Sequence, residues 1–161
     1  MTAKLQVNEQ AGVFHLKGSM DQSSDFSPLL KAGEPLVLNL AGVDQINSLG
    51  IQKFMTFLKD WGSKKLEYRQ CSVPFLLAAS MIPAMVKPPV DGAAIRIKSL
   101  YCPYRCGACK KTSDVLIDVS KIREGADGFL PPEDPGSCQH CGKAELAFDD
   151  EPEQYFQFMK V

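Results

Sequence analysis

The sequence of 161 residues lacks a hydrophobic run long enough to span a bilayer, which takes about 20 consecutive apolar residues. Its longest apolar stretch, residues 73–86, is shorter and contains Pro74 and Pro83. The first ten residues are polar and alternating, so they do not resemble the apolar core of an export signal. These absences predict a cytoplasmic protein without a membrane span.

Catalytic motifs are also missing. The sequence contains no glycine-rich phosphate loop, and its Ser, His and Asp residues are not arranged for nucleophilic catalysis. His15 lies in the middle of an alternating segment, which is typical of a structural histidine. We therefore expect that the protein is not an enzyme.

Six cysteines are present, and four of them form two Cys-x-x-Cys steps, Cys106-Gly-Ala-Cys109 and Cys138-Gln-His-Cys141. A two-residue gap lets both sulfurs of a step face one ion, and a second step from a distant segment completes a tetrahedral site. Four protein sulfurs leave no open position for water, which disfavours a catalytic zinc. The spacing therefore predicts a structural Zn²⁺ held by Cys106, Cys109, Cys138 and Cys141.

Neighbouring residues leave alternatives open at this site. Cys102 stands four residues before the first step and competes for a place in it, although the gap inside the first step matches that of the second. His140 lies inside the second step, where simultaneous ligation with its neighbour is awkward, so a place beside the metal or in solvent is favoured. The remaining Cys71 is expected to be a small core residue. Free or redox-active thiols are the alternative to a metal site.

The metal site divides the chain into two parts. A short segment that cannot bury a large core gains stability from a metal, so residues 99–161 are expected to form a four-cysteine zinc ribbon after a domain of residues 1–98. Residues 1–98 contain eleven Lys or Arg and eight Asp or Glu, whereas residues 99–161 contain seven and eleven. An acidic ribbon repels a phosphate backbone, which disfavours nucleic acid as a partner and favours protein. The boundary between residues 87 and 101 stays undecided.

Periodicity in the first part predicts a small α/β fold. Strand-like segments cover residues 5–7, 13–16, 36–40 and 65–69. Residues 18–21 are expected to break the second strand. Helices are expected over residues 24–31, from Asn47-Ser48 to Trp61, and over residues 74–86 with a break near Pro83. After a turn at residues 87–92, residues 93–100 form a strand that either closes this sheet or opens the ribbon.

Two motifs in this order resemble the STAS family, whose founding members are bacterial anti-sigma factor antagonists. Gly18-Ser-Met-Asp21 is similar to the family's Gly-x-hydrophobic-Asp. Leu36-Val-Leu-Asn-Leu-Ala-Gly-Val43, followed by Ile46-Asn-Ser-Leu-Gly50, resembles the family's buried strand, short loop and Asp-Ser-Ser-Gly helix start. The resemblance covers roughly residues 5–98. It implies a STAS-like mixed sheet with helices and a non-enzymatic regulatory function in signal transduction through protein–protein interaction.

In the STAS family, a partner serine kinase phosphorylates the first serine of the four-residue motif, and Ser48 occupies that position here. The family's aspartate is replaced by Asn47 and its second serine by Leu49. The resemblance implies a phosphoacceptor at Ser48, with Asp21, Asn47, Leu49 and Gly50 as partner-binding residues. The implied partner is an anti-sigma-type serine kinase or a larger signalling assembly.

Ser48 also has a simpler interpretation, because a serine at a helix N-terminus is favoured as a cap for an unpaired backbone amide. A phosphate there would be accepted by the free amides and would add about two negative charges, so docking to an acidic or apolar partner face would fail. Two rival functions remain open. One is a phosphorylation-independent STAS adaptor, and the other is a redox sensor in which oxidation of the thiolates releases zinc.

Overall fold

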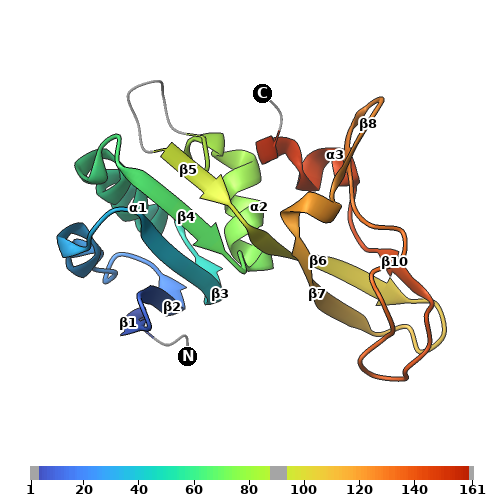
Figure 1. Cartoon of the computed structure of the whole chain (residues 1–161). Coiled ribbons are helices and arrows are strands. Elements are labelled where there is room, and N and C mark those ends of the chain that lie inside the picture. Colours follow the sequence, from blue (N-terminus) through green and yellow to red (C-terminus); the bar gives the residue numbers. More distant parts are fainter. Residues whose placement is uncertain (1–3, 88–93, 160–161) are drawn as a thin grey trace.

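The computed structural model describes residues 4–87 and 94–159, which form a larger and a smaller β-sheet joined side by side (Figure 1). The chain passes directly between them, because β5 (Ala94–Ile97) belongs to the larger sheet and β6 (Ser99–Cys106) to the smaller one. The strand predicted over residues 93–100 is therefore two strands, one in each sheet, and its first residue lies outside the described residues. Residues 88–92 of the predicted turn lie outside the described residues.

The larger sheet has five strands in the order β1-β2-β3-β4-β5. The first four are β1 (Gln6–Gln10), β2 (Val13–Met20), β3 (Leu36–Ile46) and β4 (Lys65–Arg69). β1 and β2 form an antiparallel hairpin, whereas β2–β3, β3–β4 and β4–β5 are parallel pairs. Parallel neighbours require crossover connections, which are mostly helical here. The predicted α/β class with a mixed sheet is confirmed.

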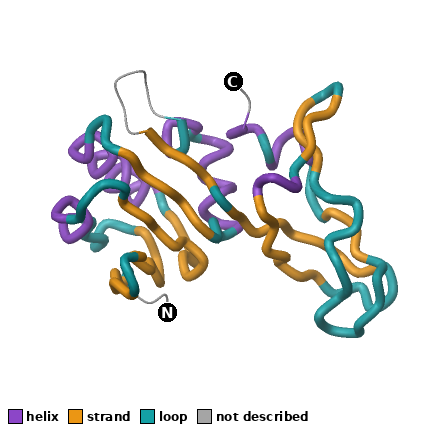
Figure 2. The backbone as a smooth tube through the Cα atoms, viewed as in Figure 1, coloured by secondary structure: helices purple, strands orange, loops and turns teal. Residues whose placement is uncertain are grey.

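Two helices cover one face of this sheet and leave its opposite face open in the described part of the chain (Figures 1 and 2). They are α1 (Ser48–Trp61) and α2 (Val73–Met81), and the 3₁₀ helix η2 (Pro83–Met85) follows α2. The predicted break near Pro83 is confirmed, since a proline cannot donate the backbone hydrogen bond that would continue α2. Within residues 4–87 and 94–159, no helix has both the length and the apolar character that a membrane crossing requires.

Buried aromatic side chains form the core between the sheet and its helices. Each of these rings has a neighbouring ring centroid 5.4–5.9 Å away: Phe26, Phe54, Phe57, Tyr68 and Phe75. Such pairs stabilise a core beyond the apolar area that they bury. β4 contributes Leu66 and Tyr68 to this core, because alternate residues of the strand point toward the helices.

Some predicted elements differ from the observed ones in extent. β2 does not break at Gly18 but continues to Met20, because Gly18 adopts a φ of 114° and the pairing with β3 shifts register between Gly18 and Ser19. Such an irregularity absorbs an extra residue without ending the strand. β3 likewise runs past Leu40, and the helix predicted over residues 24–31 is a 3₁₀ helix, η1 (Ser27–Lys31).

The smaller sheet is antiparallel and has the order β10-β6-β7, with β7 at Thr112–Asp118 and β10 at Leu146–Phe148. A 3₁₀ helix, η3 (Val119–Lys121), leads to a separate hairpin of β8 (Arg123–Gly125) and β9 (Gly128–Leu130). The described chain ends with α3 (Pro152–Tyr155) and the 3₁₀ helix η4 (Gln157–Met159).

The C-terminal helices connect the two sheets by packing against α2 (Figure 1). The hydroxyl of Ser80 on α2 donates a hydrogen bond of 3.0 Å to the carbonyl of Tyr155, and the Tyr155 hydroxyl donates to the carbonyl of Tyr101 on β6. The aromatic side chains of this tail are buried, as expected for residues that cover a core: Tyr155, Phe156 and Phe158. One continuous apolar core therefore runs through both parts of the chain.

Candidate functional site

The four cysteines of the two Cys-x-x-Cys steps meet where β6 ends. Their Sγ atoms all lie within 4.8 Å of one another. The Sγ atoms of Cys106 and Cys141 are 3.6 Å apart, and those of Cys109 and Cys138 are 3.7 Å apart. Four sulfurs at a Zn–S distance of about 2.3 Å lie about 3.8 Å apart along the edges of a tetrahedron. The donor set and its spacing therefore fit one tetrahedral metal ion.

Both steps fold into the same backbone turn. The N–H four positions after the first cysteine donates back to its carbonyl, from Lys110 to Cys106 at 3.0 Å and from Gly142 to Cys138 at 2.8 Å. The first cysteine in turn donates its own N–H to the carbonyl five positions on, at 3.0 Å and 2.9 Å. Lys110 and Gly142 occupy the same left-handed position, with φ of 65° and 78°. The two steps are thus structurally equivalent, although only the second has the glycine that favours this turn.

Backbone amides inside each turn point at the first sulfur. The N–H of Ala108 donates to Cys106 Sγ at 3.4 Å, and the N–H of His140 donates to Cys138 Sγ at 3.3 Å. The amide of Cys109 contributes most to lowering the pKa of Cys106 to about 7, and the amide of His140 contributes most to lowering that of Cys138. A lower pKa favours the thiolate, which is the form that binds a metal.

The other residues weighed for this site lie outside the four-sulfur group. Cys102 is buried in β6, where burial raises its pKa to about 12. The His140 side chain is exposed, and its Nε2 lies 3.1 Å from the carbonyl oxygen of Thr112. Cys71 is buried at the end of β4, and burial raises its pKa as well.

The second cysteine step also leads the chain back to β6. The N–H of Gly107, inside the first step, donates to the carbonyl of Glu145 at 2.9 Å, and Leu146 of β10 pairs with Cys106. Beyond β10, the N–H of Asp149 donates to the carbonyl of Pro103 at 2.9 Å. The four-cysteine cluster therefore fixes the start of the segment that runs through β10 to α3, and α3 packs against α2.

Ser48, the predicted phosphoacceptor, is the first residue of α1 and is exposed. It does not cap the helix, so the capping interpretation is wrong. Asn47 is the N-cap, and its side-chain oxygen accepts a hydrogen bond of 2.8 Å from the N–H of Gly50. The side chain of Leu49 is 47% exposed, which excludes an inward-packed Leu49.

Gly50 lies at a close approach between α1 and the end of β2. It is buried, and a Cβ atom there would lie 2.0 Å from the carbonyl oxygen of Met20. The same carbonyl accepts the N–H of Asn47 at 3.1 Å. Gly50 is thus placed to bring the start of α1 against the end of β2, next to the backbone of Asp21.

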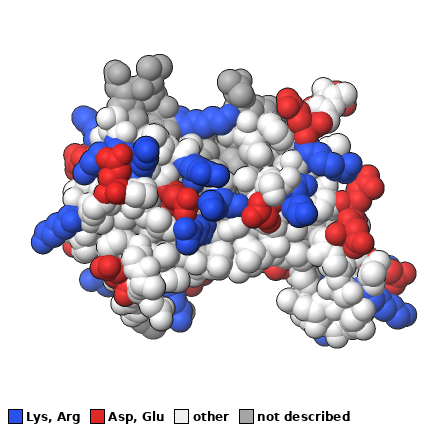
Figure 3. Space-filling model, in the orientation of Figure 1, with Lys and Arg blue, Asp and Glu red and all other residues white. Residues whose placement is uncertain are grey.

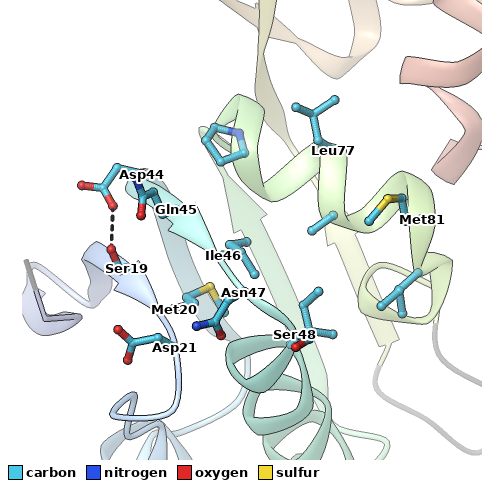
Figure 4. Close-up of a pocket in the computed structure, with 14 residues that line it drawn as sticks. Ser19, Met20, Asp21, Asp44, Gln45, Ile46, Asn47, Ser48, Leu77 and Met81 are labelled. Atoms are coloured by element: carbon cyan, nitrogen blue, oxygen red, sulfur yellow. Dashed lines mark hydrogen bonds between the residues drawn. The ribbon is translucent and has the colours of Figure 1, made fainter. Parts of the chain in front are cut away.

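A groove of about 670 Å³ opens at the carboxyl ends of β2 and β3, between the start of α1 and the side of α2 (Figure 4). Of the residues predicted from the sequence, it brings together Asp21, Asn47 and Ser48, which come from two motifs far apart in the chain. Leu49 and Gly50 do not line it. The convergence follows from the parallel pairing of β2 with β3, which places the ends of both strands at one edge.

The opposite wall of the groove is apolar and was missed by the sequence reasoning. It is formed by α2, on which Leu77 is 46% and Met81 is 77% exposed. Figure 4 shows both side chains on α2, across from Asp21 and Asp44. The residues of α2 are apolar on every side of the helix, so its sequence has no polar face that would indicate which side points outward.

Carboxylates lie along the strand side of the groove. Asp44 accepts a hydrogen bond of 3.3 Å from the hydroxyl of Ser19 (Figure 4). Asp21 accepts from the hydroxyl of Ser23 at 2.6 Å and from its N–H at 2.8 Å, and these bonds lower the pKa of Asp21. This side of the groove is therefore negatively charged at neutral pH.

The open face of the larger sheet has the opposite charge. Side chains there alternate with the core-facing residues of β4 and β5, and they include Lys65, Arg69 and Arg96. Glu67 on the same face pairs with Arg69 at 2.6 Å. Blue side chains accordingly gather over the middle of the view in Figure 3.

Comparisons with protein-family models, with curated proteins and with solved structures find no significant match for this chain. The resemblance to the STAS family therefore depends on the two sequence motifs and on where the fold places them.

Proposed function

We propose that the protein is a non-enzymatic, STAS-like protein-binding module in signal transduction, with binding controlled by phosphorylation of Ser48. The single observation that carries this proposal is the position of Ser48. It is exposed in the first turn of α1 and lines the groove, while Asn47 performs the capping role that would otherwise explain a serine there. A serine that the helix does not need is open to a role in binding.

The geometry around Ser48 supports a STAS-like reading of residues 1–98. Asp21 of the first motif and Ser48 of the second line one groove. Asn47 is bonded to the carbonyl of Met20, so both motifs form one local structure. A partner that contacts the groove therefore contacts both, as expected for an anti-sigma-type serine kinase or a related signalling assembly.

We further propose that residues 99–161 form a ribbon around a structural Zn²⁺. Four thiolate ligands at tetrahedral spacing are the donor set of structural zinc sites, and such a site contributes directly to folding. Elemental analysis of the purified protein tests the metal. One zinc per chain is expected, whereas iron or a metal-free, disulfide-bonded mass would overturn the zinc assignment.

Phosphorylation of Ser48 is tested by purifying the protein from its native cells and measuring its intact mass under denaturing conditions. A phosphate-sized increment that maps to Ser48 is expected in at least one growth condition. Quantitative affinity capture with Ser48→Ala and Ser48→Glu then tests the effect on binding, with Ser63→Glu as the control at an exposed serine in the turn after α1. A captured partner should cross-link to the groove, and its recovery should change with Ser48→Glu but not with Ser63→Glu.

The phosphorylation-independent adaptor is the principal rival. It predicts that no phosphate is found on Ser48 and that both Ser48 variants capture the same partner as the unmodified protein. Such a result would overturn the switch and leave the groove as a constitutive docking site.

A redox sensor is the second candidate, and the exposure of Cys141 favours it. Its Sγ lies 3.6 Å from that of Cys106, so peroxide can convert the two thiolates to one disulfide with uptake of two protons and release of two waters, which ejects the metal. Zinc release by mild peroxide, together with a reversible change in partner capture, is the result that this candidate predicts. A metal that resists peroxide rejects it.

A further inference from the structure

The groove beside Ser48 continues across α2. A second cavity of about 320 Å³ lies between α2 and the C-terminal helices, and it shares Leu77 and Met81 with the first. These two side chains form an exposed apolar ridge with a hollow on either side. The surface on which a partner can dock is therefore longer than the pocket at Ser48, and it includes residues from both parts of the chain.

The charged side chains that line this surface have one sign, although Lys4 lies near Asp21 at its border. The described residues that line the two cavities include Asp21, Asp44 and Asp150, and they include no Lys or Arg. More carboxylates, Glu151 and Glu153, are exposed close to Asp150 in the chain. An apolar ridge with acidic borders complements a segment that carries apolar residues in its centre and cations at its sides.

Backbone hydrogen bonding decides the conformation of that segment. β2 and β3 contribute only their ends to the groove. β4 pairs with β3 only over Leu36–Asn39, so in the described chain the last residues of β3 pair with β2 alone. An extended peptide can pair with this short edge, but the ridge and the second cavity are formed by α2 and the C-terminal segment, whose described residues present no strand edge there. Most backbone groups of an extended peptide laid along the whole surface would therefore stay unpaired. A helix satisfies its own backbone groups, so only its side chains need partners on this surface.

We propose that the surface formed by the two cavities and the ridge of Leu77 and Met81 binds a cationic amphipathic helix of a partner protein. The apolar stripe of that helix contacts Leu77 and Met81, and its Lys or Arg side chains face Asp44 on one side and Asp150 on the other. This inference deepens the proposed function and rests on it for the role of the groove.

A cationic partner also determines the direction of the Ser48 switch. The reasoning from sequence expected a phosphate to prevent docking to an acidic or apolar face. Against a cationic helix, the added negative charge attracts the partner, so phosphorylation strengthens docking. The structure thus assigns Ser48 the role of a positive switch.

The probe for this proposal is a fluorescein-labelled amphipathic helical peptide made of Leu, Ala and Lys, titrated with the full-length, metal-loaded protein. The comparison peptide has Glu in place of every Lys. Binding of the Lys peptide is expected to be at least about tenfold tighter than that of the Glu peptide and to weaken with added salt. Ser48→Glu should tighten binding of the Lys peptide severalfold.

Matched variants locate the binding surface. Leu77→Gln and Leu116→Gln change leucines of equal 46% exposure, on α2 and on β7 respectively. The first should weaken binding of the Lys peptide about tenfold, as for an anchor residue, and the second should leave it unchanged. The pair Asp44→Asn and Asp150→Asn should also weaken binding, whereas Asp127→Asn and Asp134→Asn should not. Thermal melting of each variant shows that the fold is retained.

Several results would overturn the proposal. Equal or tighter binding of the Glu peptide would reject a cationic partner, and equal effects of Leu77→Gln and Leu116→Gln would place the peptide elsewhere. If Leu77→Gln destabilises the protein, Met81→Gln at the more exposed position decides in its place. The peptide experiment is independent of the cellular phosphate, so the absence of phosphate on Ser48 would reject the switch and leave the docking surface standing.

Discussion

The side-chain oxygen of Asn47 accepts a hydrogen bond of 2.8 Å from the backbone N–H of Gly50, and this bond begins α1. A cap accepts from the amide two or three positions on, which makes Asn47 the cap and places Ser48 inside the first turn. The bond also draws the chain at Gly50 toward the carbonyl of Met20, where only a glycine fits. Asn47 and Gly50 therefore determine the backbone around Ser48, and the serine side chain does not.

We expect Asn47→Ala to lower the free energy of unfolding by about 1 kcal/mol, since it leaves the Gly50 amide without its partner. Ser48→Ala should change it by less than about 0.5 kcal/mol, as for an exposed residue without a structural role. Urea denaturation of the two variants measures both values. A loss for Ser48→Ala as large as that for Asn47→Ala would show that the hydroxyl supports the helix.

Gly50→Ala is expected to destabilise the protein by about 3 kcal/mol, because its Cβ would collide with backbone at Met20 and force α1 away from β2. Gly33→Ala is the control, since nothing lies within 4 Å of a Cβ at that position. Thermal and urea melts compare the two. Equal stability of both variants would contradict the close approach of α1 to β2.

The two cysteine turns should respond differently to substitution at the left-handed residue that each contains, Lys110 in the first and Gly142 in the second. Gly142→Ala introduces a Cβ at a φ of 78° and should lower both stability, by about 1 kcal/mol, and metal affinity. Lys110→Gly relieves the same strain at a φ of 65°, but it adds flexibility to the unfolded chain, so its net effect should lie within about 0.5 kcal/mol. Competition with a chromophoric chelator measures affinity. A large loss for Lys110→Gly would mean that its side chain supports the site.

Alkylation should separate the six thiols into two groups. Burial raises the pKa of Cys71 and Cys102, that of Cys102 to about 12, so both stay protonated and unreactive at pH 8 in the folded protein. The pKa of Cys106 is about 7 and that of Cys138 is lowered, so a chelator should expose these two to iodoacetamide first. Although a backbone amide lowers the pKa of Cys141, desolvation and hydrogen bonds from neighbouring thiols raise it to about 11, so Cys141 should react more slowly. Peptide mass mapping counts the adducts. Labelling of Cys102 before the protein unfolds would contradict its burial in β6.

Removal of the metal should loosen the C-terminal helices as well as the cysteine turns. Cys106 pairs with Leu146 of β10, and the chain from β10 leads to Tyr155, which is bonded to Ser80 of α2. Hydrogen exchange should therefore increase in β10 and α3 after chelation, while β2, β3 and β4 keep their protection.

Cys138→Ser should reproduce this pattern without chelator. Unchanged exchange in α3 would show that its contact with α2 does not depend on the metal site. Faster exchange throughout the chain would show that both parts unfold as one unit.

Local signals were sufficient for the order of helices and strands in residues 1–98 and for the cysteine cluster, and they failed where distant segments meet. The strand at Lys65–Arg69 was predicted with its observed bounds because alternation is a local property. The strand through Gly18 was cut short because the register shift that carries it onward depends on pairing with β3. Leu77 is exposed although α2 is apolar on every side, because the rest of the fold leaves that side of the helix uncovered. No local sequence pattern indicates which side this is.

The sequence by itself determined the α/β class and the convergence of Cys106, Cys109, Cys138 and Cys141, because periodicity and ligand spacing are written within short segments. Only the tertiary structure decided that Asn47 caps α1, that Asp21 and Ser48 share one groove, and that α2 exposes Leu77. The cap is a local bond, but two adjacent residues could each have made it, whereas the shared groove and the exposure of Leu77 depend on contacts between residues far apart in the chain. Such contacts form only when parallel strands align their ends and the helices settle on one face of the sheet.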